Sequence, residues 1–274
     1  MIRKLLFIEL QKLLPNTTFR VLIILHAGLF LLVAFLSTQI DISMPGVELK
    51  NMHQFPVIWN LFTWLASYFN LFLAILIIVS VGNEFSFRMF RQHAIDGLQR
   101  NELITGKLLV ILILSFYSLI LVFLITLVFG LFCSTEPDLS VMFDRAYYLF
   151  VYFLQTVAYM SLALLITILL RNTALSIIVF VFYFFPVEPV IRQFFPDTVA
   201  QYFPMKIISK LTPAPETSDF INFQFQGAYN GQDINNQITG YAGDLPLFVN
   251  ISVCALYIAV FILLSTIIMN RRNL

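Results

Sequence analysis

The stretch NEFSFRMFRQHAIDGLQRNELITGK, residues 83–107, is the only long polar and basic segment that lies between two apolar runs of membrane length. It holds four of the sixteen Lys and Arg residues of the chain in 25 positions. Since both flanking runs are apolar enough to cross a bilayer, the stretch must connect two transmembrane helices. Any function assigned to the chain has to explain a charged segment at this place.

The composition predicts an all-α integral membrane protein. Of the 274 residues, 59% are hydrophobic and 11% are charged, whereas a soluble domain carries about 25% charged residues. The net charge of +1 gives no bulk electrostatic case for nucleic acid binding. Two cysteines exclude a disulfide framework or a Cys-rich metal site, although a single bridge between Cys133 and Cys254 stays open.

Six apolar runs approach the length of roughly 20 residues that a spanning helix needs. The first is preceded by a helix over residues 1–15, which Pro15 ends and whose mixed apolar and basic spacing is typical of an interfacial helix. We expect its lysines to face lipid headgroups; the alternative is a plain continuation of the first span. The predicted spans are 19–38, 57–82, 107–132, 147–170, 173–187 and 247–269.

The basic residues predict the orientation. With the N-terminus inside, eleven of the sixteen Lys and Arg residues fall on the cytoplasmic side and five on the outer side. The positive-inside rule therefore places both termini, and the stretch 83–107, in the cytoplasm.

Familiar catalytic motifs are missing from the sequence. The three histidines, His26, His53 and His93, lie on different sides or at different depths and do not form a metal site. We expect His26 to be a neutral, hydrogen-bonded imidazole, with a proton relay as the alternative. Residues 101–108 imitate the end of a phosphate-binding loop, but Asn101 and Leu108 replace the first glycine and the Mg²⁺-binding hydroxyl. We therefore expect no catalytic residue, no metal and no ATP site in this chain.

Two further groups of polar residues are candidates for a role. Thr63, Ser67 and Asn70 share one face of the second span, where they either line a substrate path or make interhelical hydrogen bonds. Glu188 and Arg192 are spaced for an ion pair at the outer end of the fifth span, as a structural pair or as part of a transport site. They open an extracytoplasmic loop, residues 188–245, whose aromatic, proline-rich start either re-enters the membrane or rests on its surface.

The stretch itself predicts a short helix over residues 84–95, a turn at Asp96-Gly97 and a return to helix before the third span. Its charged face holds Glu84, Arg88 and Arg91, and another face holds Phe87, Phe90 and Ala94. Such a helix is suited to docking in a groove of a partner protein. The alternative is a helix that lies on anionic lipid.

Glu84, the short helix and the segment DGLQRNELITGKL, residues 96–108, resemble the corresponding part of ABC-2-type (type V) ABC transporter permeases. In that family an acidic residue ends the second helix, a coupling helix docks on the ATPase, and an Arg-containing turn with Gly-Lys starts the third helix. The layout of an interfacial helix, six spans and re-entrant segments before the last span is also similar. Met89-Phe90 departs from the small Gly-Thr pair often found in the family.

The resemblance implies the permease subunit of an ABC exporter for a lipid-like, drug-like or peptide substrate, in the inner membrane of a bacterium. A separate ATPase would bind ATP and Mg²⁺ and dock on residues 83–107, and a second permease, identical or different, would complete the pathway. Membrane lipid and an external partner at residues 188–245 are further expected contacts. The alternative is a non-transporting anchor or mechanical-coupling subunit of a cell-envelope machine. The residues that the resemblance assigns to ATPase coupling are Glu84, Phe87, Arg88, Phe90, Arg91, Asp96, Gly97, Arg100 and Lys107.

Overall fold

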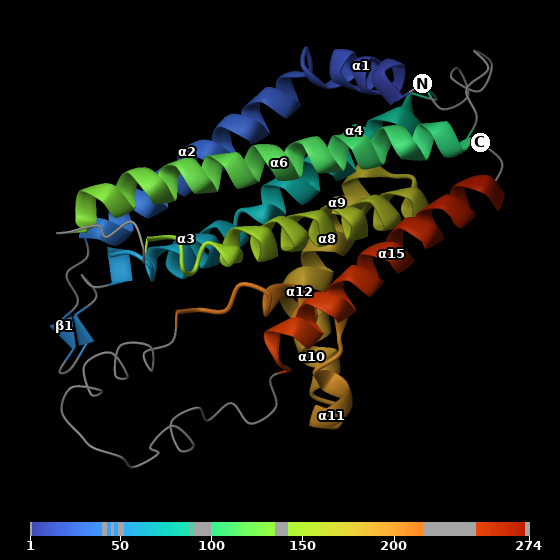
Figure 1. Ribbon diagram of the computed structural model, residues 1–274. Coiled ribbons are helices and arrows are strands. Elements are labelled where there is room, and N and C mark those ends of the chain that lie inside the picture. Colours follow the sequence, from blue (N-terminus) through green and yellow to red (C-terminus); the bar gives the residue numbers. More distant parts are fainter. Residues whose placement is uncertain are drawn as a thin grey trace.

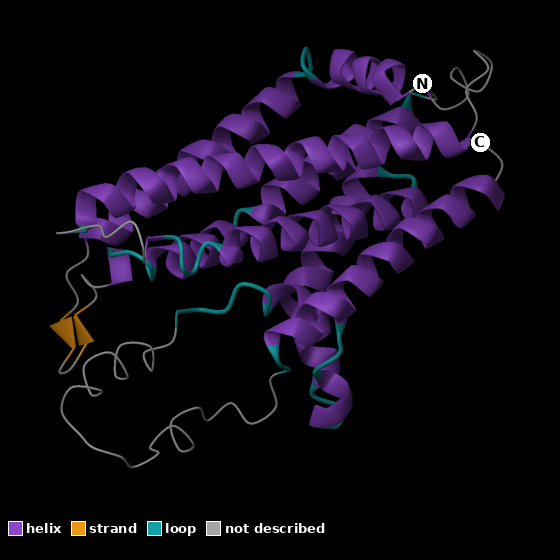
Figure 2. Cartoon of the chain, viewed as in Figure 1, coloured by secondary structure: helices purple, strands orange, loops and turns teal. Residues whose placement is uncertain are grey.

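The computed structural model describes residues 2–39, 43–44, 47–48, 52–87, 89, 100–134, 142–215 and 245–271. Within these residues the regular structure is helical except for one short antiparallel ladder, in which β1 (Ser43–Met44) pairs with β2 (Val47–Glu48) (Figure 2). Neither Cys133 nor Cys254 forms a disulfide.

Six of the described helical runs are long and apolar enough to cross a membrane, which confirms the predicted all-α membrane fold. A shorter helix, α1 (Ile2–Leu13), precedes them, and two short ones, α11 (Asp197–Ala200) and α12 (Pro204–Ser209), lie before the last. Four of the six runs are single helices: α2 (Thr17–Gln39), α6 (Arg100–Cys133), α8 (Tyr147–Leu170) and α15 (Leu247–Arg271). The second run consists of α3 (Ile58–Ser67) and α4 (Asn70–Ser86). The fifth run consists of α9 (Thr173–Phe182), the π-helical turn η2 (Tyr183–Val187) and α10 (Glu188–Arg192).

Two of these runs are not regular α-helices throughout. The second is interrupted at Tyr68 and Phe69, where neither proline nor glycine marks the break. The fifth widens into a π-helical turn that contains Pro186. Because proline lacks an N–H group and clashes with the preceding turn, it favours such a local widening. The run continues beyond Val187, the last residue of the predicted span, to Arg192.

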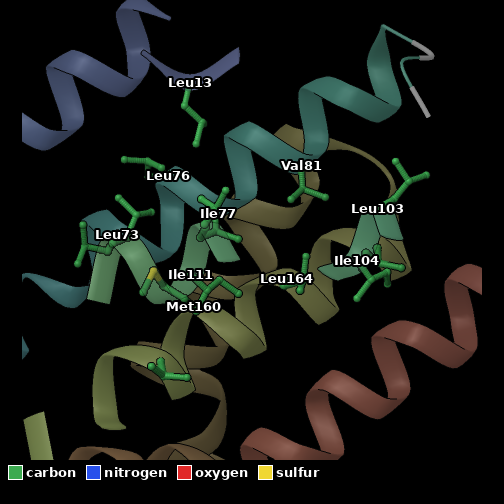
Figure 3. Packing of buried hydrophobic residues seen from close by; sticks show 14 of the residues in the cluster. Leu13, Leu73, Leu76, Ile77, Val81, Leu103, Ile104, Ile111, Met160 and Leu164 are labelled. Atoms are coloured by element: carbon green, nitrogen blue, oxygen red, sulfur yellow. The ribbon is translucent and has the colours of Figure 1, made fainter. Parts of the chain in front are cut away.

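The central helix of the bundle is α8. It contacts α4, α6, α9 and α15, and most of its side chains are buried (Figure 1). One core cluster joins α4, α6 and α8 and also receives Leu13 from α1, as Figure 3 shows. A second cluster packs α8 against α12 and α15. The segment that follows α10 therefore folds back against the bundle.

Both ends of the described chain lie at the same end of the bundle, near the last turn of α4 and the first turn of α6 (Figure 1). We call this the terminal end. Here α1 packs against α6. It buries the stripe Leu5, Glu9 and Leu13, while Phe7 and Leu14, which follows the helix, are 60% and 59% exposed. The helix α1 thus agrees with the amphipathic spacing of the first residues. The face that carries Leu5, Glu9 and Leu13 packs against the protein and not against lipid.

Candidate functional site

Four charged side chains meet at the terminal end and form an ion cluster that joins α1, α4 and α6. Lys107 Nζ lies 2.6 Å from Glu9 Oε2 and 2.6 Å from Glu84 Oε1. Lys12 Nζ lies 3.1 Å from Glu84 Oε1 and 3.4 Å from Glu9 Oε1. Each cation therefore faces both carboxylates, and the four formal charges cancel.

The cluster is shielded from solvent. The residues Glu9, Glu84 and Lys107 are each 5% exposed or less, and the side chain of Lys12 is 23% exposed. Buried charges persist only when they are paired and hydrogen-bonded. Removing one partner from such a group typically costs about 3–5 kcal/mol, since it leaves an uncompensated charge.

A glycine on α6 makes room for α1. A Cβ atom built on Gly106 would lie 3.3 Å from Glu9 Oε1 and 3.4 Å from Glu9 Cγ, which is tight contact. Gly106 thus lets the Glu9 carboxylate approach α6, and Lys107, the next residue, binds it. In this structure Gly106 and Lys107 together form the contact of α6 with Glu9 of α1.

The last turn of α4 also contacts the connection between α8 and α9. The guanidinium carbon of Arg171 lies 5.6 Å from the centre of the Phe85 ring. A Cβ atom on Gly82 would clash with Thr173 Oγ1 and lie 3.0 Å from Thr173 Cα, so only glycine permits this approach of α4 and α9. Arg171 has a φ of 54°, and Asn172 caps α9 by accepting the N–H of Leu175 at 3.1 Å.

Among the residues that the resemblance assigned to ATPase coupling, Glu84 and Lys107 are brought together in the ion cluster. Both are buried, and their contact joins α4 to α6. Phe87, one turn beyond Glu84, is 69% exposed. Arg100 is the first residue of α6. The remaining ones lie outside the described residues: Arg88, Phe90, Arg91, Asp96 and Gly97.

Glu9 and Lys12 are site residues that the sequence did not predict. The lysines of the first helix are predicted to face lipid headgroups, whereas Lys12 points to Glu84 and Glu9. A signal was present, because Glu9 is the only acidic residue in α1 and lies on the same stripe as the apolar residues Leu5 and Leu13. A single acid on the packing face of a basic helix indicates a buried cationic partner.

Two of the three polar residues of the second span, Thr63 and Asn70, are buried in the interior of this chain. Asn70 is fully buried, and its Oδ1 accepts hydrogen bonds from Tyr152 Oη at 3.2 Å and Thr156 Oγ1 at 3.1 Å, both on α8. Thr63 and Ser67 each donate to a backbone carbonyl of their own helix at 2.7 Å. Asn70 therefore makes the interhelical hydrogen bonds that the sequence offered as the alternative to a substrate path.

Glu188 binds backbone amides. It is 1% exposed, and its two carboxylate oxygens accept the N–H groups of Met205 and Lys206, each at 2.8 Å. No ion pair with Arg192 is found within the described residues, so the expected pair is replaced by this contact. The first N–H groups of α12 have no partner inside their own helix. The fold places them next to the Glu188 carboxylate, which accepts their hydrogen bonds.

Six membrane-length helices define the chain as a multi-pass membrane protein. Residues 98–274 match the family model described as ABC-2 family transporter protein. The chain belongs to this family of membrane permeases, which implies association with an ABC ATPase and dimerisation in general terms. The matched range includes Lys107 but not Glu9, Lys12 or Glu84. A search of curated proteins found no match.

Proposed function

We propose that this chain is the membrane-spanning permease subunit of an ABC exporter and that a separate ATPase subunit docks on residues 83–107. Family membership supports the permease role. The ion cluster supports the place of coupling, because Glu84 and Lys107 lie at the two ends of that segment and are joined directly at 2.6 Å. ATP and Mg²⁺ would be bound by the ATPase.

The ion cluster would act as a mechanical joint. A force on the segment between Glu84 and Lys107 would reach α4, α6 and α1 together, since the same charges hold all three helices. From the last turn of α4 it would pass to α9 through the close contact of Gly82 with Thr173. Such a connected unit moves as a rigid body, which is the usual form of an alternating-access transition.

The pathway would lie between two such subunits, of the same or different sequence, and the substrate would be lipid-like, drug-like or a peptide. Both termini would be cytoplasmic, in the inner membrane of a bacterium. The orientation is supported by the positive-inside rule, since the predicted spans assign eleven basic residues to the cytoplasmic side and five to the outer side.

The test is purification of the full chain from its native membrane in mild detergent, followed by identification of the chains that co-purify. We expect an ABC ATPase. Arg88→Glu should release the ATPase by reversing a charge on the docking segment. Arg20→Glu is the matched control, because Arg20 is an exposed cation at the start of α2, and it should leave the complex intact.

A second variant separates docking from coupling. The pair Glu84→Gln with Lys12→Met removes one charge of each sign and so keeps the remaining Glu9–Lys107 pair balanced. We expect the ATPase to stay bound while substrate-dependent ATP hydrolysis falls. Absence of any nucleotide-binding chain from the purified wild-type complex would overturn the proposed function. ATP hydrolysis by an intact complex that moves no substrate would favour a mechanical-coupling subunit.

A further inference from the structure

An apolar groove runs between α6 and α8 on the outward side of the bundle. Its volume is about 530 Å³, and every residue that lines it is apolar. Phe116 on α6 and Phe150 on α8 form its walls and are 53% and 63% exposed, so the groove opens toward the surrounding medium. Since both helices are membrane-length, that medium is lipid.

The groove has one closed and one open end. The rings of Phe116 and Phe153 meet with centroids 4.9 Å apart and close it near the middle of α6 and at the second turn of α8. Its other end is lined by Ala146, the residue that precedes α8, whose small side chain leaves the end open. The groove therefore starts at the end of a span and leads toward the membrane centre.

The floor and the inner side of the groove are held in place. Phe123 stacks on Trp59 with ring centroids 5.8 Å apart, and Trp59, fully buried, donates its Nε1–H to the carbonyl of Met142 at 2.8 Å. On the inward side, Ser118 and Tyr152 join α6 to α8 through a hydrogen bond of 2.6 Å between their hydroxyls. The groove is thus a preformed feature of the fold.

The dimensions favour a lipid chain over a helix. From Phe116 to Phe123, as from Ala146 to Phe153, the groove follows eight residues, and their seven steps correspond to about 10 Å of helix. A transmembrane helix of a second copy must cross about 30 Å of hydrocarbon and would run past the closed end. A flexible acyl chain can enter from the headgroup level and stop there.

The open end also fits a headgroup. Tyr147 and Tyr148 stack there with centroids 4.5 Å apart, and such rings prefer the interface between hydrocarbon and headgroups. Asp144 and Arg145 precede them, separated only by Ala146, and supply both signs of charge, as a zwitterionic headgroup requires.

We infer that this groove binds one acyl chain of a membrane phospholipid, with the headgroup at the start of α8. Burial of apolar surface gives no net driving force within a bilayer, since lipid tails are as apolar as the groove. The preference comes from shape, because an unfilled groove loses the dispersion contacts that a chain provides. The inference depends only on the membrane-spanning fold and not on the proposed transport activity.

The test uses the full chain in lipid nanodiscs that contain phosphatidylethanolamine with a photoreactive group in one acyl chain. After irradiation, lipid-modified peptides are mapped by mass spectrometry. We expect residues 116–123 and 146–153 to be labelled severalfold more than the lipid-facing residues of α15. Ala146→Trp, which narrows the open end, should remove this excess. Leu256→Trp, at a 61% exposed site on α15, is the control and should leave it unchanged.

Two outcomes would overturn the inference. Equal labelling of all lipid-facing helices would show ordinary surrounding lipid without a defined site. Alternatively, Ile120→Cys in a chain that lacks Cys133 and Cys254 could form disulfide-linked dimers in the membrane without lipid labelling of the groove. The groove would then be a contact between two copies of the chain.

Discussion

Lys107 is the residue that binds both carboxylates of the ion cluster at the shortest distances. Lys107→Met keeps the length of the side chain but leaves two buried carboxylates with only Lys12. We expect a loss of stability of roughly 3–5 kcal/mol, seen as a lower melting temperature of the detergent-purified chain.

A second substitution should return part of that stability. In Lys107→Met with Glu9→Gln, one cation again faces one carboxylate, so the double variant should melt above the single variant despite carrying two changes. Arg20→Met removes an exposed cation and should stay within about 0.5 kcal/mol of the wild type. Equal melting of Lys107→Met and Arg20→Met would show that the cluster contributes nothing.

At the scale of elements, the contact of α4 with α9 depends on a glycine. Gly82→Ala would place a Cβ atom 3.0 Å from Thr173 Cα, which is backbone and cannot rotate away. The helices must separate, and we expect a loss of about 1–3 kcal/mol in the same melting assay. Gly28→Ala is the control, since a Cβ there has nothing within 4 Å and alanine favours helix by roughly 0.5–1 kcal/mol. A Gly82→Ala chain as stable as the control would contradict the observed helix contact.

The helices themselves differ in how far their sequence predicts them. Apolar runs predict α2, α6, α8 and α15 because every backbone hydrogen bond of a spanning helix is internal to the run. The break between α3 and α4 has no such local signal. It lies beside Asn70, whose carboxamide is held by Tyr152 and Thr156 of α8, so it follows from contacts between helices.

For the whole molecule, the basic residues predict that both termini lie in the cytoplasm. In a chain without Cys133 and Cys254, Arg271→Cys should react with a membrane-impermeant maleimide only after the cells are permeabilised. Asp197→Cys, at an exposed position of α11 that follows the fifth run, should react in intact cells. The reverse pattern would show that the orientation is inverted. The terminal end would then lie outside the cytoplasm and could not be the docking place of the ATPase.

By itself, the sequence determined that this is an all-α membrane protein with six spanning helices, and its resemblance to ABC-2 permeases named the family. Both follow from local information, namely apolar runs and a short motif. Only the tertiary structure decided that Glu9 and Lys107, 98 positions apart, bind each other, and that Glu188 binds α12. The physical reason is that a buried charge needs a partner, while the choice of partner depends on which helices pack together.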